Sequence, residues 1–527
     1  MGDTLAQVIA PEVPIAPGRD FCGDGLEPVP AKISLPIGGP LPQLCFTDLS
    51  SLSRTAKRDG LTLALSAEEQ ASAAALGLVE GMPFIIGDDG SYDHHLNRFF
   101  RACPTLGVRS MYSLRAYARD ILVWMRFLQE RCDGKSLWRA GRDDIAAFHE
   151  ARRLSDPPFR ISAASWNRAV ASLDKLYRWA LDEKIITTVP FAYRQTWAHP
   201  SKPALNQPGT TNCAREKGAR KGDTRFLDLE GFNAFRDVGL RGRLPDGRED
   251  PAWRGRNGER NALFAELLIT TGLRLQEAPS LMVMELPDMA VLSGKPAKSV
   301  AFRLAAATAK GGHGREIRLP VRLIGQLQAH AGIERDIALG RMARNGLGQS
   351  DDRAIPVAEY EYRALRLGPT GRSIQVSVDQ LSAADRHRLV DVATGAPLAL
   401  WLTEDGRPMS MAAWEVVFLR ASARCRAMGF SDMHVTPHML RHSFAVHMLN
   451  LLLREQIGWV TGEATLPFGP VWRRVIGDPL LKLQRLMGHV RIESSYIYLD
   501  HLAEAQEIVD AAVGAFDFGL TAKEVAP

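Results

Sequence analysis

The stretch that decides the fold and the chemistry of this chain is Thr436-Pro437-His438-Met439-Leu440-Arg441-His442-Ser443-Phe444-Ala445. Further along come Leu486-Met487-Gly488-His489 and then Tyr498. Proline is frequent at the first position of a helix, so Pro437 predicts a helix that runs from Met439 to Leu453. Together the two segments collect arginine, histidine and tyrosine side chains in one C-terminal block, and no other part of the sequence carries a comparable set of reactive groups.

The size and composition of the chain describe an ordinary globular protein. Its 527 residues are too many for a single hydrophobic core, so two or three domains are expected. The net charge of +5 is mildly basic and does not by itself require a nucleic-acid partner. The six cysteines are scattered without a CxxC pair, which argues against a disulfide framework or a thiolate zinc site and favours a reduced, cytoplasmic setting. Neither a signal peptide nor a membrane-spanning run is expected.

Apolar residues at helical spacing predict three helices between residues 113 and 180. The third of these helices carries Ser165, Asn167 and Arg168 in its first turns, and all three side chains can reach phosphate oxygens or base edges. Arg115 lies off the apolar face of the first helix. These polar side chains fit either a DNA-binding face or the solvated surface of a helical bundle, and both interpretations stay open.

A basic linker is predicted over residues 199–225, which are rich in proline, glycine and cations and include Lys217 and Lys221. A flexible basic strap suits a clamp that follows the DNA backbone, because phosphate contacts need charge more than shape. A plain solvated linker is the competing interpretation. The proline-rich residues 1–90 are interpreted as a partly irregular extension, since proline lacks an amide donor and prevents long helices.

The second half of the chain mixes helical and strand patterns. Residues 261–273 predict an apolar helix directly before Arg274. Residues 299–304 and 315–319 alternate like two strands of a hairpin, and the glycine-rich turn between them puts Lys310 at the tip. The remaining expectations are a polar, irregular insertion over 333–397, a short strand over 398–402, a helix over 411–428 and a second insertion over 453–478.

The reactive side chains match the needs of a metal-free attack on a phosphodiester. Two guanidiniums can clamp the non-bridging oxygens, because their planar forks match phosphate geometry. A lysine can deliver a proton to the leaving oxygen, and histidines can position the phosphate or shuttle protons near neutral pH. A tyrosine can form a covalent phosphoester. The residues that supply these parts are Arg274, Lys310, His438, Arg441, His489 and Tyr498.

This pattern resembles the tyrosine recombinases, the phage-integrase class of site-specific recombinases. The family's T-G-x-R-x-x-E and K-G-x-x-x-R segments are similar to Thr271-Gly272-Leu273-Arg274-Leu275-Gln276-Glu277 and to Lys310-Gly311-Gly312-His313-Gly314-Arg315. The family's H-x-L-R-H signature corresponds to His438-Met439-Leu440-Arg441-His442. Its L-G-H box is close to Met487-Gly488-His489, and the family's tyrosine corresponds to Tyr498.

The resemblance implies a mechanism and a setting. It assigns the nucleophile to Tyr498, the oxyanion clamp to Arg274 and Arg441, the acid to Lys310, the base or proton shuttle to His438, and phosphate positioning to His489. The implied partner is double-stranded DNA with specific recombination sites, bound by a homotetramer. Accessory recombination proteins are further implied partners. No cofactor, metal or membrane is implied. The implied task is integration, excision or transposition of a mobile element, in a cytoplasmic protein associated with the nucleoid.

The expected fold is that of a multidomain, mainly α protein with a small β-sheet, in which a helical core-binding (SAM-like) domain precedes an α+β catalytic domain. The expected segments are an N-terminal extension over 1–90, the helical DNA-binding domain over 91–198, the linker over 199–225, the catalytic domain over 226–515 and a tail over 516–527. The two insertions at 333–397 and 453–478 are expected to decorate the surface of the catalytic domain.

Alternatives remain open at three points. A type IB topoisomerase-like enzyme would use the same chemistry and reseal the same strand, and a DNA-binding accessory protein would carry a silent active site. His438, His442 and His447 also fit a zinc site, although no glutamate of the H-E-x-x-H type accompanies them. Tyr496 competes with Tyr498 as nucleophile; residues two apart on a helix point to nearly opposite sides, so only one of them can face the phosphate.

Overall fold

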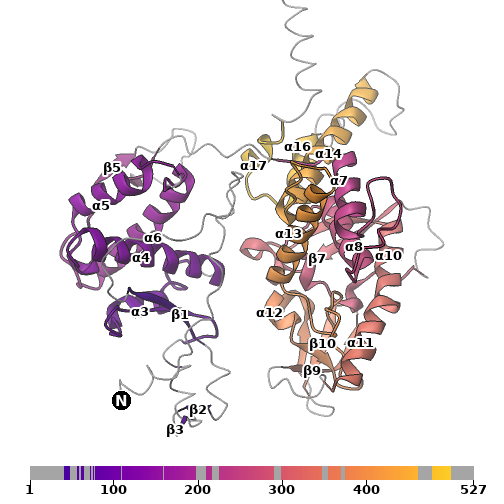
Figure 1. Ribbon diagram of the computed structural model, residues 1–527, viewed down its shortest axis with the longest axis horizontal. Helices are drawn as coiled ribbons and strands as arrows, with labels where there is room; N and C mark the ends of the chain where they lie inside the picture. Colours follow the sequence, from indigo (N-terminus) through magenta and orange to yellow (C-terminus); the bar gives the residue numbers. More distant parts are fainter. Residues whose placement is uncertain are drawn as a thin grey trace, which may run out of the picture. The chain divides into compact units, whose positions relative to one another are not determined.

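The computed structural model describes residues 41–47, 56–58, 61–63, 72, 75, 78–108, 110–157, 159–196, 209–216, 225–289, 298–346, 354–361, 363–368, 374–460 and 478–499. The chain forms two compact units, Met1–Gly222 and Asp223–Pro527 (Figure 1). Within the described ranges, no helix is long and apolar enough to cross a membrane. Lys217, Lys221, most of the N-terminal extension and the C-terminal tail lie outside the described residues.

The first unit is mainly helical, with three small antiparallel strand pairs. Its helices are α3 (His94–Ala102), α4 (Met111–Arg131), the short η2 (Leu137–Arg139), α5 (Arg142–His149) with its continuation η3 (Glu150–Leu154), and α6 (Ala163–Asp182). Its strand pairs are β1 (Gln43–Phe46) with β4 (Pro83–Ile86), β2 (Ala56–Arg58) with β3 (Leu61–Leu63), and β5 (Tyr193–Thr196) with β6 (Gly209–Asn212). The three helices predicted between residues 113 and 180 are confirmed.

Large aromatic side chains fill the core of the first unit. Trp124, Phe148, Trp166 and Tyr177 are all nearly inaccessible to solvent. The buried polar atoms among them are paired: Trp124 Nε1 donates to Tyr177 Oη at 2.8 Å, and that hydroxyl donates to the carbonyl of Leu137 at 2.9 Å. Burial of rings of this size supplies much of the stabilisation of such a bundle, and the pairing removes the cost of buried donors.

Within the linker predicted over residues 199–225, residues 209–216 are described by the structure, and these are not a free strap. Residues 209–212 form β6, and the residues after it are held on the helices of the first unit. Trp166 Nε1 donates to the carbonyl of Ala214 at 2.8 Å, and the Asn167 side chain contacts both the amide and the carbonyl of Glu216. Arg153 binds the Glu216 carboxylate through two nitrogens at 2.9 and 2.7 Å. Residues 209–216 therefore belong to the first unit.

The second unit combines helices with a hairpin and a small sheet. Its helices are α7 (Leu229–Ala234) with its continuation η4 (Phe235–Leu240), α8 (Gly258–Thr271), α10 (Val321–Gly332), α11 (Glu334–Arg344), α12 (Ala383–Arg386), α13 (Met411–Ala427), α14 (Pro437–Val460), α16 (Pro479–Met487) and α17 (Glu493–Tyr496). Its strands are β7 (Ser299–Leu304), β8 (Arg315–Pro320), β9 (Ile355–Glu361), β10 (Ala364–Leu367), β11 (Ile374–Ser377) and β12 (Leu389–Asp391). Single 3-10 turns cover Ala278–Ser280, Val283–Glu285, Ala306–Thr308, Lys310–Gly312 and Val378–Gln380.

The hairpin and the helices predicted for the second unit are confirmed. β7 pairs with β8 in antiparallel register from Ser299 opposite Pro320 to Leu304 opposite Arg315, and Lys310 lies in the turn between them. The helix predicted from Met439 begins earlier and continues further, to Val460. The core between the hairpin and the helices contains a stacked pair, Phe264 and Trp414, whose ring centroids are 3.6 Å apart.

Two predictions for the middle of the second unit were wrong. Residues 333–397 are not irregular: they contain α11 and a four-stranded sheet in the order β11-β10-β9-β12, with its own buried core. Residues 398–402 do not form a strand, although they are buried and make isolated bridges through Ala399 and Leu402. In Figure 1, β9 and β10 lie at the end of the second unit opposite to α16 and α17, so these two strands are remote from the described C-terminal helices.

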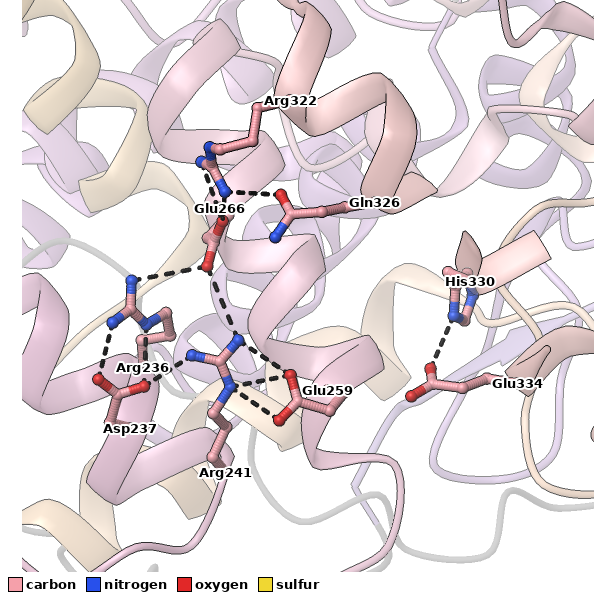
Figure 2. A network of polar contacts seen from close by, with 9 residues as sticks. All are labelled: Arg236, Asp237, Arg241, Glu259, Glu266, Arg322, Gln326, His330 and Glu334. Atoms are coloured by element: carbon pink, nitrogen blue, oxygen red, sulfur yellow. Dashed lines mark hydrogen bonds and ion pairs between the residues drawn. The ribbon is translucent and has the colours of Figure 1, made fainter. Parts of the chain in front are cut away.

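A network of ion pairs joins the elements around α8 (Figure 2). Its centre is the nearly buried carboxylate of Glu266 on α8, which accepts from Arg322 of α10 at 3.2 Å. Arg236 of η4 and Arg241, the residue after η4, approach the same carboxylate to 3.6 and 3.9 Å. The charges are balanced by Asp237 and Glu259, which pair with these two arginines. The network therefore holds α8 between η4 and α10.

Candidate active site

The end of α8 delivers Arg274 to the site. Gly272 ends the helix in the left-handed conformation, with φ +64°, which glycine adopts without a steric penalty. A Cβ at this position would lie 2.3 Å from the Phe444 ring of α14, so the two helices approach closely only because this residue is glycine. The chain then turns, and Arg274 Nη2 lies 3.3 Å from the carbonyl of Gly488 beyond α16.

Arg441 is held by the ends of two helices. Its side chain projects from α14, with 3% of the residue exposed. One Nη atom donates to the carbonyl of Gly272 and the other to the carbonyl of Met487, so a single guanidinium ties together the C-terminal ends of α8 and α16. The C-terminal carbonyls of a helix carry partial negative charge, and a cation placed there is favourable.

A buried carboxylate organises the cations around it. Glu277, with no exposed surface, accepts from Arg315 through both oxygens at 2.7 and 2.6 Å and from Arg274 Nη1 at 2.9 Å. Arg315 at the start of β8 also donates to the carbonyl of Leu486 at 3.1 Å. Although burial raises the pKa of Glu277, the contacts with Arg315 and Arg274 outweigh it and lower the pKa below its ordinary value.

Tyr498 is buried, and the charges of Arg441 and Arg274 act on its phenol. Its residue is 1% exposed and belongs to the cluster that contains Phe444, Leu483 and Met487. The phenolic oxygen lies 3.0 Å from Nδ1 of His442, and the Tyr498 ring also stacks on His489 with the ring centroids 6.2 Å apart. Burial raises the pKa of Tyr498, while the positive charges of Arg441 and Arg274 act in the opposite direction.

The remaining candidate residues are more accessible to solvent than Tyr498 and Arg441. His438 and Lys310 are exposed, while His489 is partly buried and its Nδ1 lies 2.9 Å from Ser495 Oγ. The His438 ring meets the His442 ring edge to face, with centroids 4.2 Å apart. Desolvation by the surrounding protein lowers the pKa of His438, and the positive charges of Arg441, Arg274 and Lys310 lower it further.

The site is strongly positive before any ligand is present. Burial, and after it the neighbouring Arg274, lower the pKa of Arg441 to about 9. A cation that is destabilised by burial and by a like charge is stabilised when an anion binds beside it. The arrangement is thus suited to an oxyanion, with a buried phenol, an imidazole in contact with that phenol and two guanidiniums whose charges act on the same phenol.

Five of the six predicted residues are linked by contacts or by electrostatic effects on one another's ionisation: Arg274, Lys310, His438, Arg441 and Tyr498. His489 joins them through its stacking on Tyr498. The sequence interpretation missed the contact of His442 with the phenol, for which the only signal was its position next to Arg441. Tyr496, the competing tyrosine, is 47% exposed.

The DNA-binding residues predicted in the first unit contact protein groups in this structure. Arg115 donates to the carbonyl of Gly81 at 3.3 Å, and its guanidinium lies over the Phe46 ring. Ser165 lies 3.1 Å from the Ser162 hydroxyl. Arg168, whose side chain is 48% exposed, pairs with Asp120 at 3.0 Å. Asn167 contacts the backbone of residue 216 as described above, and a role of any of these side chains in DNA binding stays a prediction.

Two of the three histidines considered as zinc ligands, His442 and His447, contact different groups. His442 contacts Tyr498, and Nε2 of His447 lies 2.8 Å from the carbonyl of Leu227. Among the described residues, no group of three or more His, Cys, Asp or Glu side chains is arranged to hold a metal ion.

Replacing Glu277 by glutamine is expected to destabilise the second unit by about 3–5 kcal/mol, because it leaves Arg315 and Arg274 without their buried counter-charge. The measurement is the urea dependence of unfolding. The pKa of Glu277 is depressed in the folded state, so its contribution is present above the unfolded value and is lost as the pH falls through the folded value. The difference between variant and wild type should therefore shrink in acid.

Glu316→Gln is the matched control, since Glu316 is the exposed neighbour of Arg315 on the same strand. Its effect is expected to stay within about 0.5 kcal/mol. Equal losses for the two variants, or a Glu277→Gln loss that is independent of pH, would contradict the assigned role of the buried carboxylate.

Comparison with known proteins finds a family match within the first unit. Residues 96–184, which span α3 to α6, match the family model described as phage integrase, N-terminal SAM-like domain. The first unit is thus similar to the N-terminal SAM-like domain of phage integrases. The matched residues include α6, which carries Ser165, Asn167 and Arg168.

Two curated tyrosine recombinases are similar over part of their length. Tyrosine recombinase XerC of Roseiflexus sp. (strain RS-1) is 27% identical over 147 residues, which are 27% of this chain and 37% of that protein. Tyrosine recombinase XerC of Roseiflexus castenholzii (strain DSM 13941 / HLO8) is 26% identical over 134 residues, which are 25% of this chain and 33% of that protein. The chain therefore matches 33–37% of the length of these relatives.

Solved recombinase structures show a distant likeness. The crystal structure of the XerH site-specific recombinase bound to a palindromic difH substrate aligns over 81% of this chain and 85% of that chain, with 14% identity and a TM-score of 0.42. A lambda integrase dimer bound to a COC′ core site aligns over 76% and 92%, with 15% identity and a TM-score of 0.35.

Proposed function

We propose that this protein is a site-specific tyrosine recombinase or integrase that cuts and rejoins duplex DNA through a 3′-phosphotyrosine intermediate. The observation that carries the proposal is the convergence on one buried phenol: His442 lies 3.0 Å from the Tyr498 oxygen, and Arg441 and Arg274 both act on the ionisation of that phenol. A tyrosine among two guanidiniums and two histidines has the parts of a nucleophilic attack on a phosphodiester.

In the proposed reaction, Tyr498 attacks the scissile phosphorus and the 5′-oxygen leaves. Arg274 and Arg441 donate hydrogen bonds to the non-bridging oxygens, which gain charge in the pentacoordinate transition state. Both guanidiniums are positioned before the substrate arrives, Arg274 by Glu277 and Arg441 by two helix ends. Preorganised donors of this kind stabilise the transition state without a reorganisation cost during the reaction.

The proton transfers complete the proposed cycle. Lys310, exposed in the turn of the hairpin, supplies a proton to the leaving 5′-oxygen, and His489 positions the phosphate. The family pattern assigns the proton of Tyr498 to His438. The 5′-hydroxyl of a partner duplex then attacks the phosphotyrosine, which releases the tyrosine and joins the strands.

The wider setting is proposed from the family resemblance. The substrate is double-stranded DNA with specific recombination sites, and a homotetramer exchanges the strands in two steps through a Holliday junction. The task is integration, excision or transposition of a mobile element, in a cytoplasmic, nucleoid-associated protein that works with accessory recombination proteins. The helical first unit, together with the positive charges of Lys217 and Lys221, contributes phosphate contacts, because such contacts need charge more than shape.

The proposal is tested by covalent trapping. The probe is a pool of duplexes with a randomised core and a nick placed so that the short 5′-hydroxyl strand diffuses away after cleavage. DNA that stays attached to the full chain under denaturing conditions is recovered and sequenced, and peptide mass spectrometry maps the attached residue. Attachment at Tyr498 is the expected result. Attachment at another residue, or no attachment from any duplex in the pool, would overturn the proposal.

The selected duplex also separates the two alternative functions. Joining of the attached strand to a second duplex is the expected behaviour of a recombinase. Relaxation of supercoiled DNA without exchange would favour a type IB topoisomerase-like enzyme. DNA binding without attachment would favour an accessory protein.

A further inference from the structure

The phenolic oxygen of Tyr498 contacts a histidine other than the one that the family pattern assigns as its base. Nδ1 of His442 lies 3.0 Å from this oxygen, within hydrogen-bonding distance, and the two ring centroids are 5.7 Å apart. His438 lies one turn earlier on α14, and its ring contacts the ring of His442. The order along the site is therefore Tyr498, His442, His438.

The surroundings of the two histidines differ in a way that separates their tasks. His438 is exposed and responds to the positive charges of Arg441, Arg274 and Lys310, which are the groups that would surround a bound phosphate. His442 is partly buried and faces the phenol. His438 thus lies on the phosphate side of the pair, and His442 lies on the nucleophile side.

A buried phenol needs a proton acceptor in direct contact. An ordinary tyrosine with a pKa of about 10 is ionised to only about one part in a thousand at pH 7. Burial raises the pKa of Tyr498, which reduces this fraction, although Arg441 and Arg274 oppose the effect. A base must lie about 2.6–3.2 Å from the group that it deprotonates, and the imidazole nitrogen of His442 meets this requirement.

We infer that His442, rather than His438, accepts the phenolic proton of Tyr498 during strand cleavage, an inference that rests on the proposed function. The O–H bond of Tyr498 breaks as its proton moves to Nδ1 of a neutral His442, and the bond from the phenolic oxygen to phosphorus forms. The bond from phosphorus to the 5′-oxygen breaks, and that oxygen takes its proton from Lys310. In the reverse step the 5′-hydroxyl gives its proton to Lys310 and its oxygen attacks phosphorus, while the bond from phosphorus to the phenolic oxygen breaks and the departing tyrosine recovers its proton from His442. In this scheme His438 contacts the phosphate, and its ring contacts the ring of His442.

The test compares His442→Asn with His438→Asn in the full chain. Asparagine keeps an amide near the position of Nδ1 and can make a hydrogen bond, but it cannot take up a proton at neutral pH. The readout is the single-turnover rate of covalent attachment to the duplex selected by the wild-type protein, measured from pH 6 to pH 9.5 at saturating DNA. The titratable groups in contact with His442 are His438 and Tyr498. Arg441 is its neighbour in sequence, and the positive charges of Arg441, Arg274 and Lys310 act on the adjacent His438.

For His442→Asn we expect attachment about 10²- to 10³-fold slower at pH 7, as for loss of a general base. The deficit should shrink towards pH 9.5, because solvent hydroxide then deprotonates an increasing share of the phenol. The apparent affinity for DNA should stay within about threefold of wild type, since His442 faces the nucleophile and not the phosphate. His438→Asn should lose rate by a factor that is independent of pH in this range.

Two further variants keep the inference falsifiable. His434→Asn changes an exposed histidine that precedes α14 and should attach at the wild-type rate. His442→Ala removes the hydrogen bond as well as the base, so a rate close to that of His442→Asn would show that the proton transfer accounts for the loss. A His442→Asn rate within about threefold of wild type at pH 7, or a deficit that recovers at high pH only in His438→Asn, would overturn the inference while the proposed function stands. Absence of attachment at Tyr498 in the wild-type protein would overturn both.

Discussion

Tyr498→Phe is expected to abolish covalent attachment to the selected duplex, with a loss of at least about 10⁴-fold, because the only atom removed is the attacking oxygen. Phenylalanine keeps the ring in its contacts with Phe444, Leu483 and Met487, so the fold should be retained. DNA affinity, measured by gel shift or anisotropy, should remain within about threefold of the wild-type value, since the ring is not exposed. The attached fraction is read from a denaturing gel under single-turnover conditions.

Tyr496→Phe is the matched control for this experiment. Tyr496 is two residues earlier and 47% exposed, whereas Tyr498 is 1% exposed and in contact with His442. Tyr496→Phe should attach at a rate within about threefold of wild type, because surface substitutions away from the reacting atoms have small effects. A loss of attachment in Tyr496→Phe together with normal attachment in Tyr498→Phe would assign the nucleophile to the other tyrosine and would overturn the proposed geometry.

Arg441→Lys is expected to slow attachment by about 10²- to 10³-fold at saturating DNA, comparable to the loss of an oxyanion-hole donor. Lysine keeps the positive charge, but it cannot reach two helix ends and a phosphate at once with a planar fork. In the structure the guanidinium already contacts the carbonyls of Gly272 and Met487, and only its remaining N–H groups are left for substrate oxygens. The measurement is again the single-turnover rate, with the melting temperature determined in parallel.

Arg335→Lys separates the structural part of this effect from the chemical part. Arg335 is also a buried arginine that donates to two backbone carbonyls, those of Pro397 and Ala399, in the middle of the second unit. Its substitution should lower the melting temperature as Arg441→Lys does, because both leave buried carbonyls poorly paired. Its attachment rate below the melting range should stay within about threefold of wild type. An equal loss of rate in both variants would reduce Arg441 to a structural residue.

Local patterns predicted most helices and the hairpin of this chain. The apolar period of α4 and α6, and the alternation of β7 and β8 around a glycine-rich turn, are properties of contiguous residues and are therefore visible in the sequence. The sheet of residues 355–391 was not predicted. Three of its strands have only three or four residues, and β12 pairs with β9 in parallel across the intervening chain, a contact for which no local pattern exists.

The candidate site shows the same division. Its candidate reactive residues were predicted from residue types and spacing, but the groups that hold them in the structure were not. Glu277 and Arg315 stood in the quoted motifs, yet their buried ion pair joins a turn after α8 to the start of β8 and is a product of the tertiary fold. The choice between His438 and His442 also depended on packing, because helical spacing places both on one face and leaves open which ring meets the phenol.

The burial of Tyr498 has a consequence for the timing of the proposed reaction. A side chain that belongs to a packed cluster and must also reach a DNA phosphate cannot do both in one rigid state. The observed speed of attachment is then the product of two quantities, the intrinsic reactivity of the phenol and the fraction of molecules in which the packing over Tyr498 has opened to a phosphate while the contact with His442 is kept. Local opening of the packing around Tyr498 would lower the measured stability of this region. In this protein the same opening would set the rate of attachment.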